Sequence, residues 1–322
     1  MSEPQIKEIE QAKYHTMVRV AWLYYEEELT QAEIGARMGL SRVTVNRLLR
    51  EARESGIVEI KIRSDLTASY PLAKQLVDRY ALRDVFISQP VTEGSEAYSG
   101  LAKAAALVLE QRLAPGVTIG VGIGRTIAYL PDFLRPAQPV QCRFTTLTGG
   151  LDLKTTYPSH SFDVINRLAS LTGGKSFYIP APSFVSEVTT RDVLMNDPLI
   201  AQSLDVARNC DVAIFSVGSA DYSALLYRSG LLAESDLADL RERQAVGDVL
   251  GRFIDAEGCE LDIEINRRII GLTIEELKKI PIKILVAGGS IKRSAIRGLL
   301  LKQGANVLVT DLNTAQWLAS TP

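Results

Sequence analysis

The stretch spanning residues 30–56 constrains this chain more than any other part of its 322 residues. It opens with a capping-box pattern, in which the hydroxyl of Thr30 and the carboxylate of Glu33 can satisfy the unpaired amides at a helix start. A helix is therefore predicted to begin at Gln31. Gly39 suits the left-handed residue that ends a helix after about two turns.

A second helix is predicted directly after this turn, with Ser41 as its N-cap. Its apolar residues recur at spacings of three and four, which predicts a buried stripe made of Val45, Leu48, Leu49 and Ala52. The side chains largely off that stripe are Arg42, Val43, Asn46, Arg47 and Arg50. Arginine can pair with guanine, asparagine with adenine, and both can hold a phosphate. Two helices joined by a short glycine-containing turn predict a DNA-binding helix–turn–helix.

Positive charge is concentrated in this region. Residues 37–63 contain seven basic and three acidic side chains, a net charge of +4, whereas the whole chain has a net charge of −2. The sequence pI of about 5.9 excludes a protein that coats nucleic acid by bulk charge. An ordinary helical hairpin with a solvated basic face is the alternative. It is disfavoured because the caps, the corner glycine and the basic face occur together.

The composition predicts a globular protein with more than one domain, since 46% of the residues are hydrophobic and 23% are charged. The three cysteines are widely separated in the sequence, which indicates neither a disulfide framework nor a metal site. No signal-peptide pattern or membrane-length apolar run is present. We therefore expect a cytoplasmic protein with no cofactor, no metal and no membrane partner.

The sequence predicts three parts. Residues 1–63 form a helix–turn–helix domain, which includes a first helix over about 5–29 and a strand or wing over 57–63. The short polar segment 64–69 is expected to be a linker. Residues 70–322 form the third and largest part.

Short apolar runs alternate with amphipathic helical stretches in this last part. The predicted strands cover residues 84–88, 117–121, 144–147, 176–179, 212–217, 284–287 and 307–310. Such alternation predicts an α/β fold with a Rossmann-like, mostly parallel sheet and helices on both faces. In such sheets ligands bind beyond the carboxyl ends of the strands.

One predicted strand runs directly into a glycine turn that contains Gly122, Gly124, Arg125 and Thr126. Glycines allow backbone amides to close on an anion at a helix start, and the arginine and threonine add a cation and a hydroxyl. A phosphate cradle and a merely tight turn both remain open. A dinucleotide fingerprint is incomplete, because Ile127 stands where its third glycine is required.

A second strand runs through Gly288 and Gly289 towards Lys292 in the first turn of a predicted helix. A cation at a helix start favours a bound anion, although a solvated lysine is an equally good explanation. Asp248 lies in the segment 247–255, where it shares one face with another aspartate if the segment is helical. Asp248 could accept hydrogen bonds from sugar hydroxyls or simply be solvated.

Few residues are available for catalysis. The only two histidines, His15 and His160, have no evident nucleophile or carboxylate arrangement around them. The rival hypothesis, a phosphosugar isomerase, deaminase or dehydrogenase with a fused helical module, is therefore disfavoured.

The order of the motifs resembles that of the SorC/DeoR-type sugar-binding transcriptional regulators of bacteria. After the helix–turn–helix come VGIGRT, LTGG, SVGSAD, AVGDVLGRFID, VAGGSIKRSAI and VLVTDLNTA. The resemblance implies a non-enzymatic effector domain that is similar to phosphosugar isomerases. That domain would bind a phosphorylated sugar or polyol and alter the binding of operator DNA, and the protein would be a homo-oligomer, usually a tetramer.

The resemblance also implies residue roles. The recognition helix matches the family pattern at Ser41, Thr44, Val45, Arg47 and Leu48. Taken together with the polar face of that helix, the predicted DNA-binding residues are Gln31, Ser41, Arg42, Val43, Thr44, Asn46, Arg47 and Arg50. The phosphate-binding residues would be Gly122, Gly124, Arg125, Thr126 and Lys292. Gly149 and Gly150 of LTGG would line the same pocket, and Asp248 would meet the sugar end. Two positions depart from the family pattern, since Ile123 replaces a frequent bulky aromatic and Asn46 a frequent serine.

Overall fold

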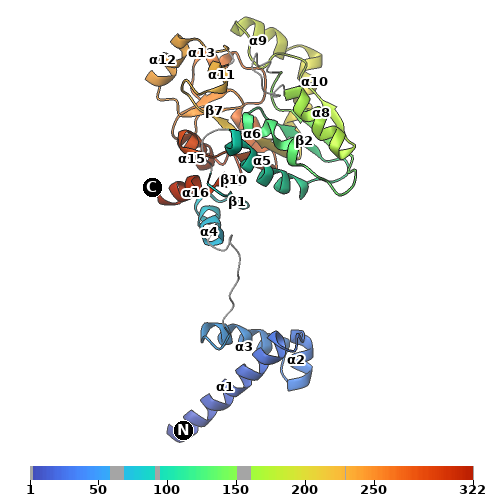
Figure 1. Ribbon diagram of the computed structural model, residues 1–322, viewed down its shortest axis with the longest axis vertical. Helices are drawn as coiled ribbons and strands as arrows, with labels where there is room; N and C mark the ends of the chain where they lie inside the picture. Colours follow the sequence, from blue (N-terminus) through green and yellow to red (C-terminus); the bar gives the residue numbers. More distant parts are fainter. Residues whose placement is uncertain (1–2, 59–68, 91–94, 151–160, 229, 322) are drawn as a thin grey trace. The chain divides into compact units, whose positions relative to one another are not determined.

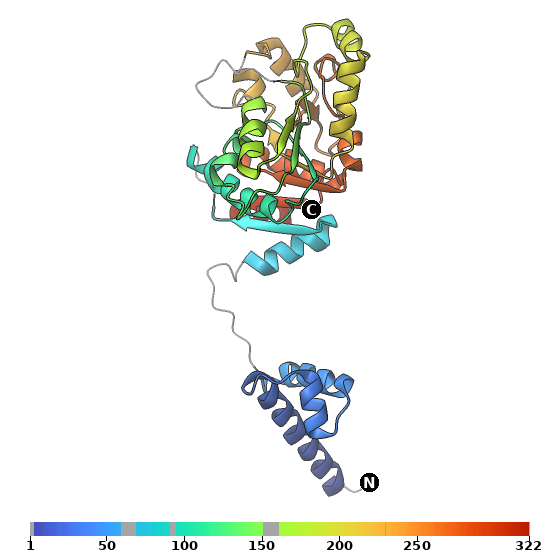
Figure 2. The same ribbon diagram turned by 90° about the vertical axis from the view of Figure 1, so that its right-hand side faces the viewer.

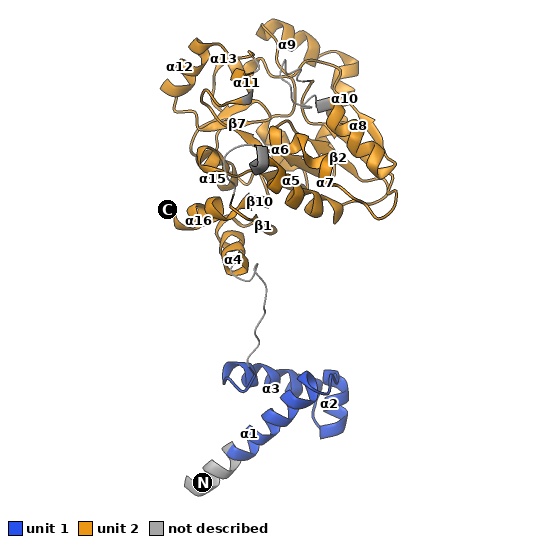
Figure 3. Cartoon of the chain, viewed as in Figure 1, with its two compact units in different colours: residues 1–67 blue, residues 68–322 orange. Residues whose placement is uncertain are grey.

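The computed structural model describes residues 3–58, 69–90, 95–150, 161–228 and 230–321. The chain falls into two compact units, Met1–Thr67 and Ala68–Pro322 (Figure 3). Within the described ranges, no helix is long and apolar enough to span a membrane. In the same ranges no group of three or more His, Cys, Asp or Glu side chains is arranged to hold a metal ion.

The described residues of unit 1 form three helices, α1 (Glu3–Tyr25), α2 (Gln31–Met38) and α3 (Arg42–Glu54). The predicted capping box is confirmed, because Thr30 Oγ1 accepts from the Glu33 amide at 3.3 Å and Glu33 Oε2 accepts from the Thr30 amide at 2.8 Å. The helix–turn–helix therefore begins where the sequence places it.

The turn between α2 and α3 also has the predicted form. Gly39 ends α2 with a φ of 66°, and Ser41 Oγ accepts from the Thr44 amide at 3.1 Å. A β-carbon at Gly35 would lie only 2.6 Å from the carbonyl oxygen of Leu40, so α2 and the turn meet backbone to backbone. The core of the unit consists of Met17, Val20, Ala21, Leu23, Ile34, Val45, Leu48, Leu49 and Ala52.

Two predictions at the edges of unit 1 have different outcomes. The first helix ends at Tyr25, four residues before its predicted end, and the acidic residues 26–28 follow it outside the helix. Negative charge at a helix C-terminus opposes the helix dipole, which accounts for this end. Of the predicted wing, only Ile57 and Val58 are described, and they pack as a bend against the three-helix core. Residues 59–68, which hold most of the predicted linker, lie outside the described ranges.

Unit 2 is built on a seven-stranded, fully parallel sheet in the order β1-β10-β9-β5-β2-β3-β4. Figure 1 labels β1, β2 and β10 of this sheet. Its strands are β1 (Asp84–Ser88), β2 (Thr118–Val121), β3 (Arg143–Thr146), β4 (Lys175–Phe177), β5 (Val212–Phe215), β9 (Ile282–Val286) and β10 (Val307–Asp311). The predicted parallel α/β sheet is confirmed, and the ends of the predicted strands shift by at most two residues. The exception is the run 212–217, which divides between β5 and the short β6 (Val217–Gly218).

Helices cover both faces of the sheet. One face packs on α5 (Ser95–Glu110), α6 (Arg125–Ala128), α7 (Leu130–Phe133) and α8 (Ser161–Thr172). The other packs on α4 (Ser69–Tyr80), α10 (Pro198–Arg208), α14 (Ile274–Lys279), α15 (Arg293–Leu301) and α16 (Leu312–Ser320). Within β5, Ile214 belongs to the first core and Phe215 to the second, as strand alternation requires. Figure 2 shows α4 against the C-terminal end of the chain.

The remaining elements extend unit 2 beyond the sheet. They are α9 (Val188–Met195), α11 (Leu225–Arg228), α12 (Glu234–Glu242), α13 (Glu264–Arg267) and the 3-10 turn η1 (Ser290–Lys292). A small antiparallel sheet joins β6, β7 (Gly247–Val249) and β8 (Arg252–Ile254).

The helical alternative for the segment 247–255 is wrong, because this segment is the hairpin of β7 and β8. Leu250 and Gly251 at its tip have φ values of 54° and 86°. Two successive positive φ angles are the signature of a tight hairpin turn.

Candidate ligand pocket and DNA-binding surface

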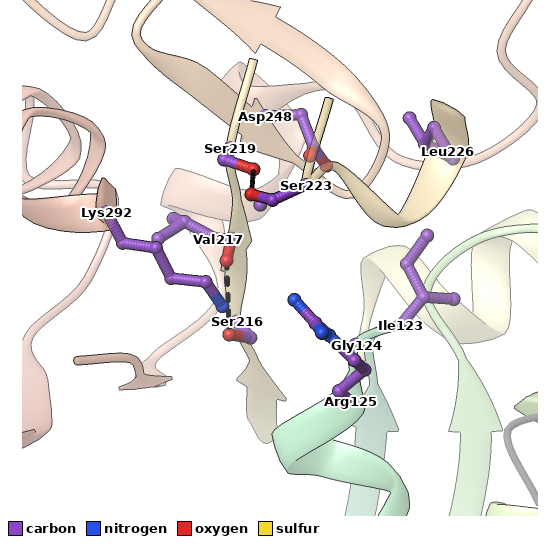
Figure 4. A pocket seen from close by; sticks show the side chains of 11 residues that line it. Ile123, Gly124, Arg125, Ser216, Val217, Ser219, Ser223, Leu226, Asp248 and Lys292 are labelled. Carbon is purple, nitrogen blue, oxygen red and sulfur yellow. Dashed lines mark hydrogen bonds between the residues drawn. The ribbon is translucent and has the colours of Figure 1, made fainter. Parts of the chain in front are cut away.

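A polar pocket lies beyond the carboxyl ends of β2 and β5, where parallel sheets usually bind ligands (Figure 4). Its lining residues are Ile123, Gly124, Arg125, Ser216, Val217, Gly218, Ser219, Ser223, Leu226, Asp248 and Lys292. Four of the eight predicted ligand-binding residues are therefore together, namely Gly124, Arg125, Asp248 and Lys292.

Arg125 supplies one cation of the pocket. It is the first residue of α6 and follows Gly124, whose φ is 146°. Its guanidinium carbon lies 4.5 Å from the centroid of the Tyr98 ring, within the range of a cation–π contact. The helix after Gly124 is divided after four residues, so its dipole is small and the main attraction for an anion here is the arginine charge.

Lys292 supplies the second cation from the opposite side of the pocket (Figure 4). It is the last residue of η1 and is partly buried. Burial, followed by repulsion from Arg125, lowers the pKa of its ammonium group from 10.5 to about 8. An anion between the two cations would relieve this repulsion and raise the pKa of Lys292.

Among the described residues that line this pocket, Asp248 is the only aspartate or glutamate. The residue is 7% exposed, and burial raises the pKa of its carboxyl group from 3.8 to about 6, against the opposing effects of the Gly251 amide and the charge of Lys292. The Gly251 amide, at the tip of the β7–β8 hairpin, donates to Asp248 Oδ2 at 3.0 Å. The hairpin therefore orients an acceptor into the pocket, which suits the hydroxyls of a polyol.

Three serines that the sequence did not single out complete the polar lining. Ser219 Oγ and Ser223 Oγ are 3.0 Å apart, and Ser216 lies at the end of β5. Asp221, in the same segment after β5, accepts from the amide and the hydroxyl of Ser223 at 2.9 and 2.6 Å. It shapes the loop and does not line the pocket. In the sequence, the run of small polar residues after the buried strand β5 could have indicated these serines.

The other four predicted residues do not line this pocket among the described residues. Thr126 is 2% exposed, and a β-carbon at Gly122 would lie 2.6 Å from the Phe215 side chain. Gly149 and Gly150 lie beyond β3, where the Gly150 amide donates to the carbonyl of Ala181 at 2.8 Å. A β-carbon at Gly149 would meet the backbone of Ala181 and Pro182, and one at Gly150 would meet the Phe162 ring. A ligand role for these two glycines remains a proposal.

The predicted DNA-binding face of α3 is exposed. Val43 is 79% exposed, and Arg42, Asn46, Arg47 and Arg50 are also exposed. Gln31 is half-buried at the start of α2.

Three of the predicted DNA-binding residues, Ser41, Thr44 and Arg47, also contact other side chains of unit 1. Ser41 and Thr44 share a hydroxyl contact of 2.8 Å at the cap of α3. Arg47 Nη1 forms a 2.9 Å ion pair with Glu51, whose other oxygen pairs with Lys13 of α1 at 2.8 Å. The Glu51 carboxylate thus holds α1 and Arg47 together.

Known proteins share both parts of the chain. Residues 64–320 match the family described as "Putative sugar-binding domain", and residues 20–55 match "Sigma-70, region 4". The transcriptional regulator LsrR of Klebsiella pneumoniae is 31% identical over 326 residues, with 98% of each chain covered. The deoxyribonucleoside regulator of Bacillus subtilis is 29% identical, covering 97% of this chain and 99% of that protein. The full-length sorbitol operon regulator SorC from Klebsiella pneumoniae has a TM-score of 0.73 and 28% identity, covering 95% of this chain and 99% of its own.

A helix–turn–helix unit followed by a parallel α/β unit with a charged pocket at its strand ends defines a ligand-responsive DNA-binding regulator. The chain belongs to the SorC-type family of sugar-binding transcriptional regulators. The resemblance seen in the sequence is thereby confirmed. The relatives also confirm the prediction of a transcriptional regulator rather than an enzyme.

Proposed function

We propose that the pocket of unit 2 binds a phosphorylated sugar or polyol, and that this binding changes the affinity of unit 1 for operator DNA. The observation that carries the proposal is the placement of Arg125 and Lys292 together with the buried Asp248 in one pocket. Two cations suit a phosphate dianion, and a buried carboxylate suits the hydroxyl groups of the same molecule.

The relatives support a role in carbohydrate metabolism. They include a deoxyribonucleoside regulator, an erythritol catabolism regulatory protein and a sorbitol operon regulator. We assign the present protein to a carbohydrate or polyol catabolic operon on this basis, acting in the cytoplasm.

DNA binding is assigned to the exposed face of α3, with Arg42, Asn46, Arg47 and Arg50 as the contacting residues. Helix–turn–helix proteins usually bind two half-sites as dimers, which requires at least two copies of this chain. A homotetramer is the assembly that the family resemblance implies. The ligand acts as a switch only if it binds two states of that assembly with different affinity.

Fluorescence anisotropy of the full chain on the DNA upstream of its own gene tests this function. The salt concentration is fixed and a scrambled duplex serves as the reference. A panel of sugar and polyol phosphates is then added to the complex. We expect one phosphorylated compound to shift the operator affinity and its unphosphorylated parent to have no effect.

Two variants assign the effect to the pocket. Lys292→Gln removes one cation and should abolish the response to the phosphorylated compound. Lys302→Gln removes an exposed lysine just after α15, the helix that follows Lys292, and should leave the response intact. Equal responses of both variants, or turnover of a sugar phosphate by the purified protein, would contradict the proposed function.

A further inference from the structure

The loop that carries Lys292 is hydrogen-bonded to two buried side chains, Asp311 and Thr314. The Gly289 amide donates to Asp311 Oδ2 at 2.9 Å and to Thr314 Oγ1 at 3.0 Å. Thr314 Oγ1 in turn donates to Asp311 Oδ2 at 2.6 Å. Lys292 follows in the same short turn, since its amide donates to the carbonyl of Gly289 at 3.2 Å.

The two glycines of this loop fit the Asp311 carboxylate. A β-carbon at Gly288 would overlap Asp311 Oδ2, and Gly289 has a φ of +92°, which L side chains rarely adopt. The glycine pair at 288–289 and the aspartate at 311 therefore form one steric unit, although twenty-two residues separate Gly289 from Asp311.

The same two side chains also begin the last helix. Asp311 is the N-cap of α16, and its Oδ1 accepts from the Thr314 amide at 3.0 Å. Asp311 is 1% exposed and Thr314 is fully buried, so no solvent replaces these bonds. A displacement of the Lys292 loop thus acts directly on the N-terminus of α16.

The other end of α16 is bound to α4, the first helix of unit 2. Tyr80 donates to the carbonyl of Leu318 at 3.0 Å in a buried contact, and Arg79 Nη1 donates to the carbonyl of Ala319 at 2.7 Å. The chain from unit 1 enters unit 2 at α4, which begins at Ser69. The nine-residue α16 therefore connects the ligand loop to the helix by which the DNA-binding unit is attached.

We infer that Asp311 and Thr314 are positioning residues for the ligand pocket and that α16 transmits the position of the Lys292 loop to α4. This inference rests on the proposed function, because it concerns the response of the same pocket. Asp311 and Thr314 do not line the pocket and act on the ligand only through the Gly288–Lys292 loop.

The positioning role is tested with a pair of substitutions at Thr314. Thr314→Val keeps the volume and loses the hydroxyl, whereas Thr314→Ser keeps the hydroxyl and loses the methyl group. Calorimetric titration of the full chain with inorganic phosphate should show about tenfold weaker binding for Thr314→Val, equivalent to about 1.4 kcal/mol. Thr314→Ser should bind phosphate as the wild type does.

Thr172→Val is the matched control for the lost hydroxyl. Thr172 is also fully buried, and its hydroxyl donates to the carbonyl of Leu168 at 3.0 Å at the end of α8. This variant should keep wild-type phosphate affinity. If Thr314 acts only by packing, Thr314→Ser should bind phosphate more weakly than Thr314→Val. That result would overturn the positioning role.

The transmitting role is tested at the far end of α16 with Tyr80→Phe, which removes only the hydroxyl bound to Leu318. The measured quantity is the ratio of operator dissociation constants with and without inorganic phosphate, at constant ionic strength. We expect Tyr80→Phe to bind phosphate normally while its ratio moves at least threefold towards one. Tyr178→Phe, a partly buried tyrosine of the β4 edge, should keep the wild-type ratio.

The outcomes separate this inference from the function on which it rests. If wild type and Lys292→Gln bind phosphate equally, the proposed function fails, and the inference fails with it. If Lys292→Gln weakens phosphate binding but Tyr80→Phe keeps the wild-type ratio, only the transmission through α16 is wrong.

Discussion

The carboxylate of Asp248 occupies the space in which a β-carbon at position 218 would stand. Gly218 lies on β6 and pairs with Asp248 on β7, and a β-carbon built on this glycine would overlap Asp248 Oδ1. The position of the Asp248 carboxylate in the pocket therefore depends on residue 218 of the paired strand having no side chain.

Gly218→Ala should displace the Asp248 carboxylate and weaken the binding of the phosphorylated effector by about tenfold or more, since one charge-assisted hydrogen bond contributes roughly 1.5–3 kcal/mol. Calorimetric titration with the effector measures this change. Gly100→Ala in α5 is the control, because a β-carbon there meets no atom within 4 Å. Unchanged effector affinity in Gly218→Ala would show that Asp248 makes no contact with the ligand.

The stability of unit 2 should depend on pH through Asp248. Its pKa in the folded protein, about 6, is above the ordinary value of 3.8, so the folded state holds the proton more tightly than the unfolded state. The resulting stability is fully present below about pH 4 and is lost as the pH rises through 6. A shift of this size corresponds to on the order of 2–3 kcal/mol.

Scanning calorimetry of the wild type and of Asp248→Asn across pH 4–8 measures this dependence. The wild type should lose stability relative to Asp248→Asn as the pH rises, because the amide remains neutral throughout. Parallel curves for the two proteins would refute the raised pKa.

The ring of Tyr98 should support Arg125 in the pocket. Because the guanidinium carbon lies 4.5 Å from the ring centroid, Tyr98→Leu should weaken phosphate binding by about 0.5–2 kcal/mol. Tyr98→Phe keeps the aromatic face and should bind phosphate as the wild type does. Equal affinities of the Leu and Phe variants would show that packing alone, without the aromatic face, positions Arg125.

Glu51 should favour operator binding although it adds negative charge to a DNA-binding helix. It holds both Arg47 and Lys13, so Glu51→Gln should release them and weaken operator binding about three- to tenfold. Glu54→Gln removes the same charge from an exposed residue 3.9 Å from Arg50 and should bind the operator at least as tightly as wild type. Anisotropy titrations at fixed salt compare the two variants, and tighter binding by Glu51→Gln would contradict the orienting role.

The parts of the structure that were predictable are those with local causes. The caps at Thr30 and Ser41 and the left-handed Gly39 depend on residues within one or two turns, and the structure contains all three. The parallel sheet was predictable for a related reason, because strands buried on both faces are continuous apolar runs separated by helical periods.

The hairpin of β7 and β8 was not predictable from local pattern. Its sequence mixes apolar, charged and glycine residues in a way that fits a helix as well as two three-residue strands. Leu250 at its tip has a positive φ, which is unfavourable for leucine, and the residue is 2% exposed. Burial of the leucine side chain offsets the local strain, and burial of this kind is a tertiary effect.

The pocket was predictable only in part. Arg125 and Lys292 follow glycine turns at strand ends, and this signal is visible in the sequence. The serines at 216, 219 and 223 line the pocket through the segment that follows β5 and contains the short β6, an arrangement that no periodicity encodes.

The contact between α4 and α16 holds the end of α16 against the far end of the helix with which unit 2 begins. Arg79, in the last turn of α4, donates to the carbonyl of Ala319 near the end of α16. The start of unit 2 and the end of α16 are therefore separated by about the length of this twelve-residue helix, roughly 15–18 Å. A short peptide can span that distance, which allows circular permutation with the chain reopened at an exposed loop. The ligand-binding unit could thus be rebuilt as a free-standing metabolite sensor, with fluorescent reporters at new termini and no operator DNA.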